Sequence, residues 1–253
     1  GGVRGIKPDR GDVILGGALV IAEAMEAGGF DALEVSEAGL RDGIFFERLL
    51  EGRDPPLFED VRRESVENLA HRFNSDAPHV AHVARLSLEL YDGLAAAGLH
   101  GFGAGERELL WAACMLHDIG TAIDYDDHHR HSRYLIEHAG LPGFSPRELA
   151  LVALVARWHR KGDPDAGELG DLRQSGDDER LALLSGVIRL AEQLERSRDQ
   201  AVATVRVAQG GDGVRLEART NGADPSVALW AARRGADLLE RALGRELEVV
   251  DGG

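Results

Sequence analysis

The strongest constraint on the fold is a long stretch, from Val61 to Ser197, in which apolar residues recur at helical spacing and loops are short. A helix with an apolar side must bury that side against a neighbour, so several such helices in succession predict a bundle. The helices expected here span residues 78–97, 106–117, 131–139, 146–159 and 178–195. The pattern therefore predicts a mainly α fold.

The residues before this stretch are predicted to be α/β. We expect a helix over 12–27 that ends at two glycines, a short strand over 32–36 and a second helix over 40–51. The run Arg53-Asp54-Pro55-Pro56 is a rigid breaker of regular structure. We therefore predict a first domain of residues 1–56 and a helical domain of residues 57–200.

The last fifty residues change character again. Segments 201–208 and 214–220 alternate apolar and polar residues around a Gly-rich turn, which is typical of a β-hairpin. A helix over 225–243 and a strand over 246–250 follow. This order predicts a small β-β-α-β unit, which makes residues 201–253 a third domain.

Composition excludes some classes of partner. The formal net charge of −15 disfavours binding to DNA or to an anionic membrane surface. The longest apolar stretch, Val13 to Ile21, is far shorter than the ~20 residues that cross a bilayer. A single cysteine, Cys114, cannot form a disulfide framework within these residues and indicates a reducing compartment. We therefore expect a cytoplasmic protein that binds neither DNA nor membrane.

The basic residues are unevenly placed, and several fall in the same stretch as most of the histidines. A single basic residue in this stretch would ordinarily lie on the solvent-exposed face of a helix. As a group beside metal ligands, they suit a phosphorylated anion. The candidates for binding substrate phosphate are Arg130, Arg133, Arg160 and Lys161.

Six of the ten histidines lie between His117 and His159. His117 and Asp118 close an apolar helix, where both side chains can turn toward one point, and His79 lies one turn before Val83 on a predicted buried face. Each histidine alone could be a core residue bonded to a carbonyl. Several that converge with an aspartate would be costly to bury without a partner, and a divalent cation would satisfy them.

These residues resemble a known pattern. His79, the pair His117-Asp118, two later histidines and a late acidic residue are similar to the metal site of HD-domain phosphohydrolases. Three segments resemble, more narrowly, the C-terminal HD-type domain of the exopolyphosphatase/guanosine pentaphosphate phosphatase (Ppx/GppA) family: His128-His129-Arg130-His131-Ser132, Leu141-Pro142-Gly143-Phe144-Ser145 and Arg157-Trp158-His159-Arg160-Lys161. Segments 3–13 and 33–43 look like the end of that family's actin-like (ribonuclease H-like) phosphatase domain, and residues 201–253 look like its closing unit.

The resemblance implies a set of metal ligands. The residues it indicates for a divalent ion (Mg, Mn, Fe or Zn) are His79, His117, Asp118, His129, His159 and Glu192. Asp118 would bridge two ions. Glu192 stands where metal-binding HD domains have aspartate, and its extra methylene is expected to weaken the site. Asp118 and His131 are the predicted catalytic residues, with His131 as the acid for the leaving group or as a merely packed histidine.

The resemblance also shows what these residues lack. The family's phosphatase chemistry belongs to an actin-like fold with an Asp-Gly-Gly-Gly-Ser type phosphate loop, and no such loop occurs here. The sequence also begins with glycine. We therefore expect the rear portion of a longer phosphatase acting on polyphosphate or guanosine pentaphosphate, with a homodimer suggested by the family. The alternatives are a stand-alone HD phosphohydrolase acting on a nucleotide or phosphoester, and a non-catalytic module that binds polyphosphate or mediates dimerisation.

Overall fold

The structure is a computed structural model that describes residues 11–33, 35, 39–210 and 213–252. Contacts divide the chain into two compact units, residues 1–58 and residues 59–253. The first unit contains the helices α1 (Ile14–Gly28) and α2 (Leu40–Leu49). Gly29, with a left-handed φ of 66°, ends α1, as the glycine pair predicts. Among the described residues of this unit, Leu50 is the single buried apolar side chain.

The strand predicted over 32–36 is wrong for the residues that can be judged. Residues 32, 33 and 35 adopt no strand, and residues 34 and 36 lie outside the described residues. A strand needs a paired neighbour. Within the described part of this unit the one β pairing is an isolated bridge between Glu51 and Arg53. Parts of the segments that resemble the actin-like domain, residues 3–10, 34 and 36–38, also lie outside the described residues.

The second unit contains the predicted helical bundle. Its helices are α3 (Val61–Arg72), α4 (Ala77–Ala96), α5 (Ala104–Leu116), α6 (His128–Ala139), α7 (Pro146–Trp158) and α8 (Asp177–Leu194). Two short 3-10 helices, η2 (Ile119–Ala122) and η3 (Ala166–Leu172), follow α5 and α7. The prediction of a mainly helical fold is confirmed. Helix α6 begins three residues earlier than expected, and this difference matters at the site described below.

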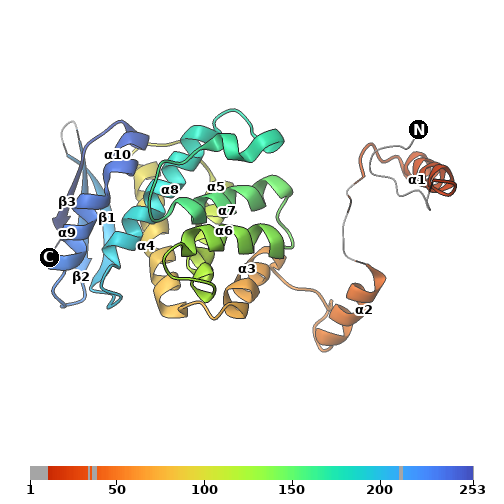
Figure 1. The fold of residues 1–253 in the computed structure, drawn as a ribbon, viewed down its shortest axis with the longest axis horizontal. Helices are drawn as coiled ribbons and strands as arrows, with labels where there is room; N and C mark the ends of the chain where they lie inside the picture. Colours follow the sequence, from red (N-terminus) through yellow and green to blue (C-terminus); the bar gives the residue numbers. More distant parts are fainter. Residues whose placement is uncertain (1–10, 34, 36–38, 211–212, 253) are drawn as a thin grey trace. The chain divides into compact units, whose positions relative to one another are not determined.

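Helix α8 is the centre of the second unit. It contacts α4, α5 and α7 in the bundle and α9 and α10 beyond it, as Figure 1 shows. The core includes the fully buried Leu86, Leu116, Leu154, Leu184 and Ile188. Burying one such side chain stabilises the fold by about 1.5–3 kcal/mol, so the shared core holds the helix ends in place.

Local capping explains where the helices that carry site residues begin. Asp76 accepts a hydrogen bond from the backbone N–H of His79, and Pro78 lies in the first turn of α4. Ser145 and Glu148 form a capping box at the start of α7. These caps set the phase of each helix and so the direction of its buried side chains.

The C-terminal residues form a three-stranded sheet in the order β1-β2-β3. Strand β1 (Val202–Gly210) runs antiparallel to β2 (Gly213–Thr220), and β3 (Leu247–Asp251) runs parallel to β2. The predicted hairpin is confirmed, although turn residues 211–212 lie outside the described residues. Strand β1 packs on α4, where Gly93 leaves room for Val207.

The helix predicted over 225–243 is divided in two. Helix α9 (Ser226–Gly235) and helix α10 (Asp237–Leu243) are separated at Ala236. Gly235, a weak helix former, precedes the interruption. Both helices contact α8, so the bundle and the sheet unit share one core. A separate domain over 201–253 stays a prediction. No described helix combines the length and the apolar character that crossing a membrane requires.

Candidate metal centre

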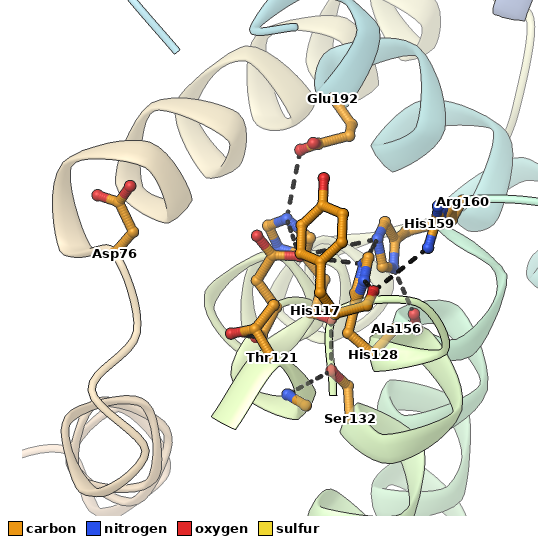
Figure 2. Close-up of polar contacts among 12 residues, drawn as sticks. Asp76, His117, Thr121, His128, Ser132, Ala156, His159, Arg160 and Glu192 are labelled. Carbon is orange, nitrogen blue, oxygen red and sulfur yellow. Dashed lines mark hydrogen bonds and ion pairs between the residues drawn. The ribbon is translucent and has the colours of Figure 1, made fainter. Parts of the chain in front are cut away.

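A group of buried histidines and carboxylates lies where five elements of the bundle meet. His79 comes from α4, His117 and Asp118 from the turn after α5, His128 from the start of α6, His159 from the end of α7 and Glu192 from α8. All are buried except Glu192, which is partly buried. Figure 2 shows Glu192 pointing from α8 toward His117, with His128 and His159 beside it.

Two of these side chains, His79 and His117, lie beside the carboxylate of Glu192 and one side of Asp118. His79 Nε2 lies 3.1 Å from Glu192 Oε2 and 3.8 Å from Asp118 Oδ2. His117 Nε2 lies 3.3 Å from Glu192 Oε2 and 3.7 Å from Asp118 Oδ1. His79, His117 and Asp118 are thus placed to share one ion.

Asp118 also faces a second group. Its Oδ1 lies 3.3 Å from His128 Nε2 and 3.9 Å from His159 Nε2, and these two nitrogens are 3.1 Å apart. Asp118, His128 and His159 therefore form another set of ligand atoms. The single carboxylate of Asp118 stands between the two groups.

Backbone carbonyls decide the tautomer of three imidazoles. The Nδ1–H groups of His117, His128 and His159 donate to the carbonyl oxygens three residues earlier, at distances of 2.6, 2.7 and 2.7 Å. A carbonyl only accepts, so Nδ1 carries the proton in each neutral ring. Each Nε2 then presents a lone pair toward Asp118, which is how imidazoles are oriented in metal sites.

The donor set fits a divalent cation. His79 Nε2, His117 Nε2 and Glu192 Oε2 are buried and form no hydrogen bond within the described residues. His128 Nε2 and His159 Nε2 lie 3.1 Å apart, so with both Nδ1 atoms protonated a proton on one Nε2 or a cation beside both is needed to keep two lone pairs from facing each other. Imidazole and carboxylate are ligands that divalent transition metals accept.

The electrostatics of the cluster keep its carboxylates ionised. Burial lowers the pKa of His117, but Asp118 and Glu192 outweigh it and raise the pKa to about 9. Burial and the charge of His117 lower the pKa of His159 to about 3. Burial also opposes the ionisation of Glu192, yet His117 and His79 hold its pKa well below the usual value. The carboxylates therefore stay ionised and attract a cation.

A close contact between the turn and α6 brings the two groups together. The Ser132 hydroxyl donates to the carbonyl oxygen of His117 and accepts from the N–H of Gly120 at 2.9 Å. A Cβ at Gly120 would overlap the backbone of His128 and Ser132. The contact between Gly120 and α6 is therefore what places His128 beside Asp118.

Comparison with known proteins identifies the family. The model described as Ppx/GppA phosphatase, domain III, matches residues 61–222, which include every residue of the two groups. The chain belongs to the Ppx/GppA phosphatase family. The resemblance stated from the sequence is thereby confirmed at the level of the family.

Two proteins similar to this chain are both named guanosine-5'-triphosphate,3'-diphosphate pyrophosphatase. The protein from Pseudoalteromonas translucida (strain TAC 125) is 30% identical over 161 residues, which is 62% of this chain and 30% of the relative. The protein from Vibrio vulnificus (strain YJ016) is 26% identical over 200 residues, which is 79% of this chain and 39% of the relative. The chain thus spans well under half of the length of these two relatives.

In this Ppx/GppA family member, two of the predicted histidines do not reach Asp118, although the ring of His129 lies 6.5 Å from that of His159. His129 is fully buried, its Nε2 lies 4.0 Å from Asp127, and neither of its ring nitrogens forms a hydrogen bond. His131 packs against Gly120, and no hydrogen bond or ion pair between described residues joins it to Asp118. The place expected for His129 is taken by its neighbour His128. Because α6 begins at His128, that residue shares a buried face with Ser132 and Ile136, four and eight positions later.

The predicted phosphate-binding residues lie at several places around the centre. Arg133 is paired with Glu137 and Glu168. Arg160 donates to the Asp126 carbonyl at 2.6 Å. Arg130 and Lys161 lie 3.8 Å from opposite oxygens of Asp127.

A cation that sequence reasoning missed reaches the centre directly. Arg198 donates to Asp118 Oδ2 at 2.7 Å. It lies in the connector after α8, eighty residues beyond Asp118, and no local pattern indicates its role.

Proposed function

We propose that this chain is part of a Ppx/GppA-type phosphatase that hydrolyses phosphoanhydride bonds of guanosine pentaphosphate or polyphosphate. In this proposal residues 57–200 are an HD-type bundle, residues 1–56 are a remnant of an actin-like domain, and residues 201–253 are its closing unit. The observation that carries it is the family match over residues 61–222. The two groups of histidines that share Asp118 lie inside the matched residues and are the metal site that this part of the phosphatase would contain. The names of the two relatives indicate the guanosine substrate.

The ligands in this proposal are His79, His117, Asp118 and Glu192 for one divalent ion, and Asp118, His128 and His159 for another. When bound, such an ion supplies Lewis acidity toward water and a phosphoryl oxygen. The chain itself contributes orientation, because the Nδ1–H bonds to backbone carbonyls prevent the imidazoles from rotating. Arg130, Arg160 and Lys161 stay candidates for outlying phosphates, and His131 stays a candidate acid.

The test combines elemental analysis with phosphate release. We expect the purified chain to retain a divalent metal, and His117→Ala to lose it, while the exposed control His138→Ala retains it. Phosphate release should be measured separately from guanosine pentaphosphate and from polyphosphate. A chain that stays metal-free after reconstitution with Mg²⁺, Mn²⁺, Fe²⁺ and Zn²⁺ would contradict the metal site.

A second candidate is a stand-alone metal-dependent phosphohydrolase. The observation that favours it is the pair of ligand groups sharing Asp118, which is the arrangement that two-metal hydrolysis needs. Turnover of simple nucleotides by this chain alone, abolished by His117→Ala, would support this alternative. Binding of polyphosphate without hydrolysis would instead favour the non-catalytic module.

A further inference from the structure

Arg198, in the connector between α8 and β1, extends its charged side chain to the candidate metal centre. Arg198 Nη2 lies 2.7 Å from Asp118 Oδ2, and Nη1 lies 3.3 Å from Asp76 Oδ2. Among the described residues it is the one arginine or lysine with a hydrogen bond or ion pair to a ligand candidate.

The connector holds Arg198 in a defined place. The backbone φ of Arg198 is 54° and that of Gln200 is 56°, both in the left-handed region that non-glycine residues rarely adopt. Arg198 N–H donates to the Glu195 carbonyl, and Asn221 Nδ2 donates to the Gln200 carbonyl, each at 2.9 Å. The strained connector is thus tied to α8 on one side and to the end of β2 on the other.

The Arg198 side chain is far more exposed than the carboxylate it contacts. The side chain of Arg198 is 43% exposed, whereas that of Asp118 is 7% exposed. A guanidinium has five N–H groups in a planar fork. The contacts to Asp118 and Asp76 occupy two of these N–H groups, and the side chain is exposed enough for the others to meet a ligand.

The charge of the candidate metal centre determines whether the N–H groups of Arg198 bind a carboxylate or a phosphate more strongly. Without metal, the negative charges of Asp118 and Glu192 are balanced by Arg198 and by His117, whose pKa is raised to about 9. Divalent cations on these ligands would neutralise the carboxylates and repel the guanidinium. A phosphate oxygen is then the stronger partner for Arg198, because guanidinium binds phosphate in a charge-assisted manner.

We propose that Arg198 is a phosphate-binding residue of this centre, which exchanges the Asp118 carboxylate for a phosphoryl oxygen when metal is bound. This inference rests on the proposed function, because it requires a metal at Asp118. The competing interpretation is that Arg198 is only a counter-ion for Asp118, with no contact to any ligand.

The two interpretations differ in binding measurements on the whole chain. We would titrate inorganic phosphate into protein loaded with Mn²⁺ and into protein freed of metal, by calorimetry, for the unmodified chain and for Arg198→Met. Loss of one charge-assisted hydrogen bond of about 1.5–3 kcal/mol should raise the Kd for phosphate about 10-fold to 100-fold in the loaded protein. Arg198→Lys should restore part of this affinity. The metal-free protein should show little difference between the variants.

The matched control is Arg196→Met, which removes the same charge from an exposed position two residues away. An equal loss of phosphate affinity in Arg196→Met would overturn the proposal in favour of general surface charge. Unchanged phosphate affinity in loaded Arg198→Met would also overturn it, and tighter Mn²⁺ binding in that variant would identify Arg198 as a counter-ion. Failure of the unmodified chain to bind Mn²⁺, Mg²⁺, Fe²⁺ or Zn²⁺ would instead remove the proposed function on which it rests. Circular dichroism would show that each variant is folded.

Discussion

At the scale of single residues, His128 and His129 are sequence neighbours with different expected roles. His128 Nε2 faces Asp118 at 3.3 Å, whereas the ring of His129 is buried without a hydrogen bond. We expect His128→Ala to weaken binding of an ion to the second group by at least about 100-fold, because even outer partners of metal ligands are worth 10–100-fold. His129→Ala should leave the metal content unchanged. Elemental analysis and metal titration check this, and the reverse result would restore the assignment expected from the sequence.

His82, also a single buried histidine, gives a pH-dependent prediction away from the metal centre. Burial is the main reason why the pKa of His82 is lowered, and Arg85 and His79 lower it further. The hydrogen bond to the Val202 carbonyl and the nearby carboxylate of Glu89 act in the opposite direction but do not outweigh burial. Glu195 also faces the ring, with its Oε2 3.5 Å from His82 Nε2. The unfolded chain therefore binds a proton more readily than the folded chain.

Since the pKa of His82 in the folded chain lies below its ordinary value of about 6.5, the stability linked to His82 is full above about pH 6.5 and is lost as the pH falls. We expect His82→Gln to reduce the slope of the free energy of unfolding against pH by up to about 1.4 kcal/mol per pH unit. Urea unfolding between pH 7 and pH 5 measures it, with the exposed His138→Gln as control. An unchanged slope in His82→Gln would refute the assignment.

At the scale of elements, the packing of α8 against α10 depends on Gly186. A Cβ built at Gly186 lies 2.9 Å from Leu239 Cα and 3.1 Å from Leu239 N, which are backbone atoms that cannot move aside easily. Overpacking of this kind costs about 1–3 kcal/mol and outweighs the gain in helix propensity of about 1 kcal/mol. We therefore expect Gly186→Ala to lower the free energy of unfolding, and Gly186→Val to lower it more. Gly105→Ala in α5, with no atom near its Cβ, should be neutral or stabilising.

At the scale of the whole molecule, metal binding should stabilise the unit of residues 59–253. An ion that binds only the folded state adds about 2.7 kcal/mol at a concentration 100 times its Kd. For a chain of this size, that corresponds to a rise in Tm of about 5–10 °C. Thermal unfolding with and without Mn²⁺ measures it. His117→Ala should lose the rise, and an equal rise in that variant would place the ion elsewhere.

Much of this molecule could be predicted from local sequence. The helices of the bundle begin at caps such as Asp76 and Ser145, and β1 and β2 follow their alternating pattern, because both signals act between residues close in the chain. The strand predicted over 32–36 is wrong at the described residues 32, 33 and 35, because pairing depends on a neighbour that local sequence does not reveal. The helix over 225–243 was predicted as continuous because each of its halves is a good helix on its own.

The sequence by itself determined the family, the helical class and most of the residues that meet at the centre, because spacing on a helix dictates which side chains point inward. Only the tertiary structure decided that His128, and not His129, faces Asp118, since this depends on where α6 begins and on its contact with Gly120. It also decided that Arg198 reaches Asp118 from eighty residues away. Local propensity carries no information about which distant segments meet, because packing of the whole core brings them together.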